Sequence, residues 1–228
     1  MRIRIITMPR TKATYLMKAI VSASNHKQWK VNADYYNEPL NNREDPRAAL
    51  EWMKSDPNAV VKHHIRHLVA DDVYNSAELF EQECKLDWMN VVVIRRDLFA
   101  TALSYARSRT LNEWHDYTIT SVRIEPEMFT NCLLALWGSL VHIARNKHNL
   151  EYNKIIFSDD LTGNPTEDIK TILPNYNREI HIDSKQSPSN TVENLDQLRK
   201  LSKTITLPHY NDAPITIDNN LLISKSYF

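Results

Sequence analysis

Glycine is almost absent from this sequence, which contains only Gly138 and Gly163 in 228 residues. A chain this poor in glycine cannot form a collagen-like helix, a glycine linker or a propeller. The same shortage excludes every glycine-rich phosphate-binding loop in its usual form, including the Walker A loop. Any loop that binds a phosphate in this protein must therefore do so without glycine.

Cysteine is also scarce, because Cys84 and Cys132 are the only two. Two thiols cannot build a disulfide framework or a thiolate zinc site, so a reducing compartment is the simplest setting. No continuous apolar run reaches the roughly 18 residues of a membrane-spanning helix. Residues 1–10 contain no long apolar segment and no small-residue cleavage site, which indicates a first strand rather than a signal peptide. We expect a soluble, cytoplasmic protein with no membrane partner.

An excess of charge of either sign is missing as well, because 28 lysines and arginines balance 28 aspartates and glutamates. A dedicated nucleic-acid-binding protein has a basic excess, so we expect no nucleic-acid partner and only a local anion site. The hydrophobic share of 42% is ordinary for a globular domain. The chain has neither an internal repeat nor a low-complexity linker, which predicts a single domain over residues 1–228.

Short apolar strands alternate with amphipathic helices along the chain. We expect strands over residues 3–8, 29–36, 59–62, 91–94 and 155–157, and helices over residues 13–24, 47–54, 73–85, 98–108, 125–147, 164–173 and 192–203. The β-branched run at 91–94 is typical of a central strand that is covered on both faces. This alternation predicts an α/β fold with a mostly parallel central sheet flanked by helices. The pattern weakens in residues 176–228, so the motif-bearing core is residues 1–175.

The turn after the first strand concentrates groups that bind an anion. In Met8-Pro-Arg-Thr-Lys-Ala-Thr-Tyr-Leu16, two hydroxyls and two cations stand where a helix begins. Unpaired backbone amides and the helix dipole favour an anion at such a place. A phosphate or sulfate site and an ordinary turn with solvated charges explain this segment about equally well.

A second candidate segment is Val91-Val-Val-Ile-Arg-Arg-Asp97, which is followed by Ser104. Arginine at the carboxyl end of a central strand points into the crevice where open α/β sheets bind ligands. Ser104 lies about two helical turns further on, roughly 10 Å along the axis, so that Arg96 and Ser104 can hold one phosphate. The alternative is that the arginines pair with nearby acids such as Asp97.

Together these segments resemble the sulfotransferases that use 3′-phosphoadenosine 5′-phosphosulfate (PAPS). The segment Pro9–Leu16 is similar to that family's Pro-Arg/Lys-Ser-Gly-Thr-Thr-Trp-Leu loop, which binds the 5′-phosphosulfate. Arg96 and Ser104 match its arginine and serine, eight positions apart, that bind the 3′-phosphate. Residues 155–168 resemble its later strand and the helix start that follows. The resemblance spans residues 9–173 and implies a single-domain, three-layer P-loop-type fold.

The resemblance also implies a set of binding residues. PAPS would contact Arg10, Thr11, Lys12, Ala13, Thr14, Tyr15, Arg96 and Ser104. Arg10 would in addition stabilise the leaving oxygen, and the reaction requires no metal. Within the loop, the sequence departs from the family at three positions, because Lys12 replaces a glycine, Ala13 replaces a hydroxyl residue and Tyr15 replaces the tryptophan that stacks on adenine. Outside it, Ser158 stands where some cytosolic members have a tyrosine that contacts adenine, and the C-terminal glycine-containing nucleotide motif of those members is not visible.

Two residues compete for the role of general base. Glu38, in Tyr35-Tyr-Asn-Glu-Pro-Leu-Asn41, resembles the glutamate of the Glu-Pro segment that is the base in carbohydrate and bacterial sulfotransferases. His64 resembles the strand-end histidine that is the base in cytosolic members. Histidine suits general-base work near neutral pH, whereas a glutamate needs burial to do so. The overall pattern is less like the cytosolic branch, which favours Glu38.

These features predict a sulfotransferase that moves a sulfuryl group from PAPS to a hydroxyl or amine of a small-molecule or carbohydrate acceptor and releases adenosine 3′,5′-bisphosphate. A nucleotide-dependent phosphotransferase is one alternative, but its loop needs a lysine followed by serine or threonine, and Lys12 precedes Ala13. The other alternative is a non-catalytic nucleotide-binding or assembly protein on the same fold.

Overall fold

The computed structural model describes residues 1–24, 26–28, 46–65, 77–112, 121–145, 150–182 and 191–207. In this part of the chain, five strands form a sheet in the order β2-β3-β1-β4-β6, and each neighbouring pair is parallel. The strands are β1 (Arg2–Thr7), β2 (Lys27–Gln28), β3 (Ala59–His64), β4 (Trp88–Ile94) and β6 (Lys154–Phe157). The short strands β5 (Ser121–Val122) and β7 (Thr191–Val192) form a separate parallel pair.

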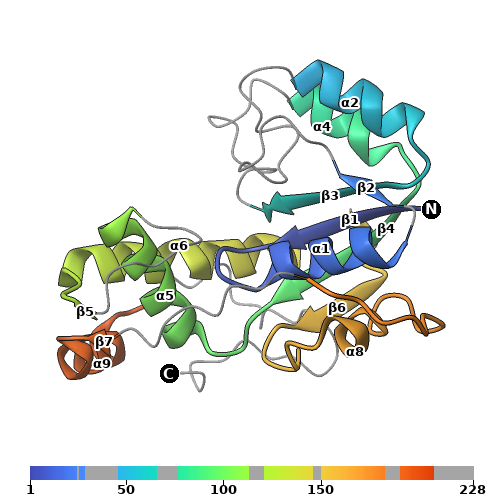
Figure 1. Ribbon diagram of the computed structural model, residues 1–228. Helices are drawn as coiled ribbons and strands as arrows, with labels where there is room; N and C mark the ends of the chain where they lie inside the picture. Colours follow the sequence, from blue (N-terminus) through green and yellow to red (C-terminus); the bar gives the residue numbers. More distant parts are fainter. Residues whose placement is uncertain are drawn as a thin grey trace.

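Helices cover both faces of the five-stranded sheet (Figure 1). They are α1 (Ala13–Ala23), α2 (Pro46–Ser55), α4 (Ala77–Cys84), α5 (Leu98–Leu111), α6 (Pro126–Arg145), α8 (Pro165–Ile169) and α9 (Leu195–Thr204). Successive residues of a strand face opposite sides. Ile3 and Ile5 of β1 therefore pack in one cluster with α1 and α8, while Ile6 packs in another with α5 and α6. The predicted α/β fold with a mostly parallel sheet between helices is confirmed.

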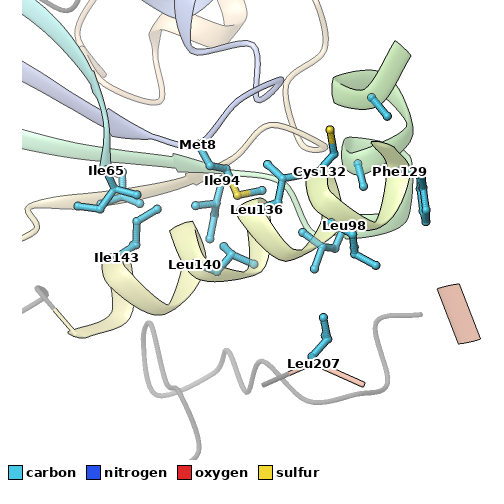
Figure 2. Close-up of a cluster of buried hydrophobic side chains, with 14 of the residues drawn as sticks. Met8, Ile65, Ile94, Leu98, Phe129, Cys132, Leu136, Leu140, Ile143 and Leu207 are labelled. Carbon is cyan, nitrogen blue, oxygen red and sulfur yellow. The ribbon is translucent and has the colours of Figure 1, made fainter. Parts of the chain in front are cut away.

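The largest core cluster lies beneath the carboxyl ends of three strands. Met8 follows β1, Ile65 follows β3 and Ile94 ends β4, and all three are buried in the same cluster. Figure 2 shows these side chains beside Leu136, Leu140 and Ile143 of α6. Because one apolar cluster anchors all three strand ends, the loops that follow them start from fixed positions.

Helix α6 has the length and composition of a membrane span, although 44% of that window is buried inside the protein. Its apolar face belongs to the core cluster just described, where Phe129, Leu133 and Leu136 are fully buried. The packing of α6 in this structure is that of a core helix.

On the side of the sheet that faces α4, a buried ionic group replaces apolar packing. The carboxylate oxygen Oε1 of Glu83 accepts a hydrogen bond from Arg4 of β1 at 3.3 Å and pairs with Nε2 of His63 of β3 at 3.0 Å. Burial alone would raise the pKa of Glu83, but His63 and Arg4 together hold it below its ordinary value. This group ties α4 to the two central strands that lead to the candidate site.

Most of the predicted elements are present, with differences at their ends. The strand β2 lies at Lys27–Gln28, and the strand predicted over residues 29–36 lies outside the described part of the chain. The helix predicted from residue 192 begins at Leu195, because Val192 pairs with Val122 in the short second sheet.

Candidate functional site

Strand β1 is the topological switch point of the sheet, because the strands that follow it in the chain lie on both sides of it. The chain places β2 and β3 on one side of β1, and β4 and β6 on the other. In open parallel sheets, ligands bind outside the carboxyl ends of the strands at such a switch point. Thr7, at the end of β1, pairs in register with His64 of β3 and Val93 of β4. The segments that follow β1, β3 and β4 therefore begin at one edge of the sheet, and they contain the predicted site residues that the structure describes.

The loop between β1 and α1 keeps a left-handed backbone without glycine. Arg10 has φ 65° and Lys12 has φ 57°. A left-handed conformation costs a residue with a Cβ about 1–2 kcal/mol. Lys12 thus adopts this conformation at the position where the loop it resembles has glycine. The Lys12 ammonium also donates to the carbonyl oxygen of Leu161 at 3.4 Å, which ties the loop to the segment after β6.

The hydroxyls of Thr7 and Thr11 stabilise this turn through buried hydrogen bonds. The Thr7 hydroxyl donates to the carbonyl oxygen of Val93 at 2.8 Å and contacts the hydroxyl of Thr11. The Thr11 hydroxyl also lies 3.1 Å from the carbonyl oxygen of Met8, and only 2% of Thr11 is exposed. Thr11, predicted as a ligand-binding residue, therefore uses its side chain to shape the loop.

The start of α1 has none of the side chains that usually complete a helix N-terminus. Among the described residues, no side chain caps it at Lys12, and its first turn contains no acidic residue. By contrast, Asp97 caps α5 and Asn164 caps α8. Uncapped amides at a helix start are donors for an anion, which the helix dipole also favours.

Arg10 connects the two segments that the sequence singled out. Its Nε donates to Oγ of Ser104, on α5, at 3.0 Å. The two residues were predicted to bind opposite ends of one nucleotide, and the structure brings them into direct contact. A cation thus stands at the junction between the β1–α1 loop and α5.

Lys62 is a residue of this site that the sequence analysis missed. It lies on β3, is only 7% exposed, and its Nζ donates to the hydroxyl of Thr14, in the first turn of α1, at 3.1 Å. Burying an ammonium group is costly unless it has polar partners. The sequence signal that could have identified this residue is a lysine at the end of the otherwise apolar segment Ala59–Lys62. Lys62 places a second cation beside the start of α1.

Of the two candidate bases, His64 lies in the described part of the chain. His64 ends β3, is half-buried, and lies next to Thr7 in register. Because side chains alternate along a strand, it shares a sheet face with Lys62. Glu38 lies outside the described residues.

Arg95 and Arg96 pair with acids of the neighbouring strand end. Arg95 Nε lies 3.1 Å from Asp159, while Arg96 binds Asp160 through Nη1 at 2.5 Å and Nη2 at 2.8 Å. These hydrogen bonds from Arg96 lower the pKa of Asp160. The predicted alternative of acid pairing is thus correct in kind, but the partners are Asp159 and Asp160 instead of Asp97.

Tyr15 and Ala13 link α1 to its surroundings. Ala13 is buried at the first position of α1. The Tyr15 hydroxyl donates to Oδ2 of Asp168 at 2.8 Å. Burial and the Asp168 carboxylate raise the pKa of Tyr15 above its ordinary value. The phenol of Tyr15, predicted to stack on adenine, thus anchors α1 to α8.

The arrangement is a corner in which two cations, Arg10 and Lys62, stand beside one helix start. Arg10 comes from the loop after β1, Lys62 from β3, and the uncapped amides from the first turn of α1, while Arg96 lies at the end of the adjacent β4. Such a corner is suited to bind a phosphate or sulfate group.

A comparison with protein-family models and with the curated proteins finds no match to this chain.

Proposed function

We propose that this chain is a cytoplasmic, PAPS-dependent sulfotransferase with a P-loop-type fold, which moves a sulfuryl group to a hydroxyl or amine of a small-molecule or carbohydrate acceptor. The observation that carries the proposal is the uncapped start of α1 with Arg10 and Lys62 hydrogen-bonded beside it. Amides and cations together fit the doubly charged phosphosulfate better than a neutral ligand.

The residues divide into two groups in this proposal. The amides of the loop and of the first turn of α1, with Arg10 and Thr14, hold the 5′-phosphosulfate. Arg96 and Ser104 hold the 3′-phosphate, as the resemblance to sulfotransferases implies. The position of both groups at the carboxyl edge of neighbouring parallel strands supports this division.

The transfer needs a base on one side of the sulfur and positive charge on the other. The acceptor oxygen attacks the sulfur as the bond from sulfur to the bridging phosphate oxygen breaks. The acceptor proton passes to Glu38 or His64, and adenosine 3′,5′-bisphosphate leaves with the electron pair. Arg10 and Lys62 stabilise the charge that develops on the bridging oxygen. Positioning of the two reactants supplies most of the remaining acceleration.

The decisive experiment is a transfer assay with radiolabelled PAPS against pools of sugars, lipids, tyrosine peptides and small alcohols. Labelled acceptor in any pool supports the proposal. Magnesium-dependent transfer of phosphate from a nucleotide, without sulfuryl transfer, would instead identify a phosphotransferase. Nucleotide binding with no transfer to any pool would identify a binding or assembly protein.

Adenosine 3′,5′-bisphosphate is expected to raise the melting temperature more than adenosine 5′-phosphate does, because Arg96 and Ser104 add contacts to the 3′-phosphate. A ligand that binds the folded state stabilises it more as its affinity rises, so the two shifts report relative affinity at equal concentration. Differential scanning fluorimetry measures both. Arg96→Ala is the control that removes the difference, and equal shifts in the wild type would contradict the assignment.

Glu38→Gln is expected to leave PAPS binding intact and to lower the transfer rate about 10²- to 10⁴-fold, the range for loss of a general base. His64→Ala is the matched variant at the competing position. Steady-state kinetics and a binding measurement on each variant separate the two effects. A normal rate for Glu38→Gln combined with an inactive His64→Ala moves the role of base to His64.

A further inference from the structure

The guanidinium of Arg96 has a fixed place at the end of β4. Its Nη1 and Nη2 donate to the two carboxylate oxygens of Asp160 at 2.5 and 2.8 Å. The guanidinium also stacks on the ring of Phe157, with its central carbon 3.8 Å from the ring centroid. The stack and the paired hydrogen bonds together hold the guanidinium in one orientation.

Asp160 presents to Arg96 the same chemistry as a phosphate group. Carboxylates and phosphates both accept the two parallel N–H groups of an arginine through two oxygens. The carboxylate of Asp160 and a phosphate of a ligand therefore cannot use Nη1 and Nη2 at the same time. One must leave before the other binds.

The surrounding contacts let Asp160 leave without moving its backbone. Asp159, next to it, accepts the backbone N–H of Arg96 at 2.7 Å and Nε of Arg95 at 3.1 Å, which fastens the segment to the end of β4. The Asp160 side chain itself is 60% exposed. A rotation of this one side chain into solvent therefore releases Nη1 and Nη2 of Arg96 from their hydrogen bonds to Asp160.

The segment of Asp160 also touches the loop at the start of α1. The carbonyl oxygen of Leu161, the next residue, accepts the Lys12 ammonium at 3.4 Å. The segment that carries Asp160 is thus also tied to the β1–α1 loop.

From this geometry we infer that Asp160 is an internal competitor of the nucleotide 3′-phosphate for Arg96, and that this carboxylate limits how strongly the site prefers a 3′-phosphorylated donor. The inference rests on the proposed function. Before a nucleotide binds, Asp160 keeps Arg96 in place, and a ligand must supply a phosphate to displace it. Nucleotides without a 3′-phosphate leave the Arg96–Asp160 pair intact.

Asp160→Asn tests the inference by isothermal titration with adenosine 3′,5′-bisphosphate and with adenosine 5′-phosphate. An exposed ion pair contributes little, so we expect the variant to bind the bisphosphate about two- to fivefold more tightly. Binding of the 5′-phosphate should not change. Glu167→Gln, which removes a carboxylate of α8 that pairs with Lys170, is the control for general charge and should change neither affinity.

Unchanged or weaker binding of the bisphosphate by Asp160→Asn would overturn the inference, as would an equal gain for both nucleotides. If the wild type prefers the bisphosphate and Asp160→Asn shows no gain, the inference fails while the proposed function stands. If neither protein distinguishes the two nucleotides, the assignment of Arg96 to the 3′-phosphate fails, and the inference falls with it.

Discussion

Lys62→Met is expected to lower the rate of sulfuryl transfer about 10²- to 10³-fold, which is the usual loss when one preorganised donor to a developing charge is removed. Lys62 is buried, and its Nζ contacts Thr14 at the start of α1. Its charge therefore acts in a water-poor place, where electrostatic interactions are stronger than in solvent. Methionine keeps the unbranched apolar stem and removes only the ammonium.

The kinetic signature of Lys62→Met separates a catalytic effect from damage to the fold. Loss of an interaction made in the transition state lowers kcat and kcat/KM together, while KM stays close to the wild-type value. Lys170→Met, at an exposed lysine of the segment that follows α8, is the matched control and should transfer at the wild-type rate. A wild-type rate for Lys62→Met, with the melting temperature unchanged, would remove Lys62 from the site.

Asp168→Ala is expected to destabilise the protein by about 3–5 kcal/mol, because four donors lose the one buried carboxylate that accepts their hydrogen bonds. Asp168 is 2% exposed. Its carboxylate accepts the backbone N–H and the hydroxyl of Thr162 at 2.8 Å each, the N–H of Gly163 at 2.9 Å, and the hydroxyl of Tyr15 at 2.8 Å. The loss corresponds to a fall in melting temperature of about 10 °C for a domain of this size.

Denaturant unfolding measures this loss directly. Glu167→Ala, one position away and exposed, should change the free energy of unfolding by no more than about 0.5 kcal/mol. Tyr15→Phe removes only one of the donors and should fall between the two. Wild-type stability of Asp168→Ala would show that the Asp168 hydrogen bonds do not hold α1 and α8 together.

Local patterns in the sequence were sufficient to predict most of the strands and the helix starts. The run at 91–94 is apolar throughout because helices cover both faces of β4, and an unbroken run of this kind is visible in the amino-acid sequence itself. Asp97 and Asn164 were recognisable as caps because a cap acts within three residues of its own position.

The contacts of the candidate site could not be predicted from local sequence patterns. Lys62 and Thr14 are 48 positions apart, Arg10 and Ser104 are 94 apart, and Arg96 and Asp160 are 64 apart. Each contact depends on which strands become neighbours, and the order β2-β3-β1-β4-β6 is not encoded in any one segment. The sequence therefore placed these segments at the carboxyl ends of the strands but did not identify the pairs formed there.

The left-handed residues of the β1–α1 loop have a consequence for ligand affinity. Arg10 and Lys12 each carry a Cβ, which restricts the backbone conformations open to the loop compared with glycine at the same positions. A turn that has few conformations to begin with loses little conformational entropy when a ligand closes on it. The backbone strain of this loop is thus a form of preorganisation, because the loop loses its conformational entropy during folding instead of during binding.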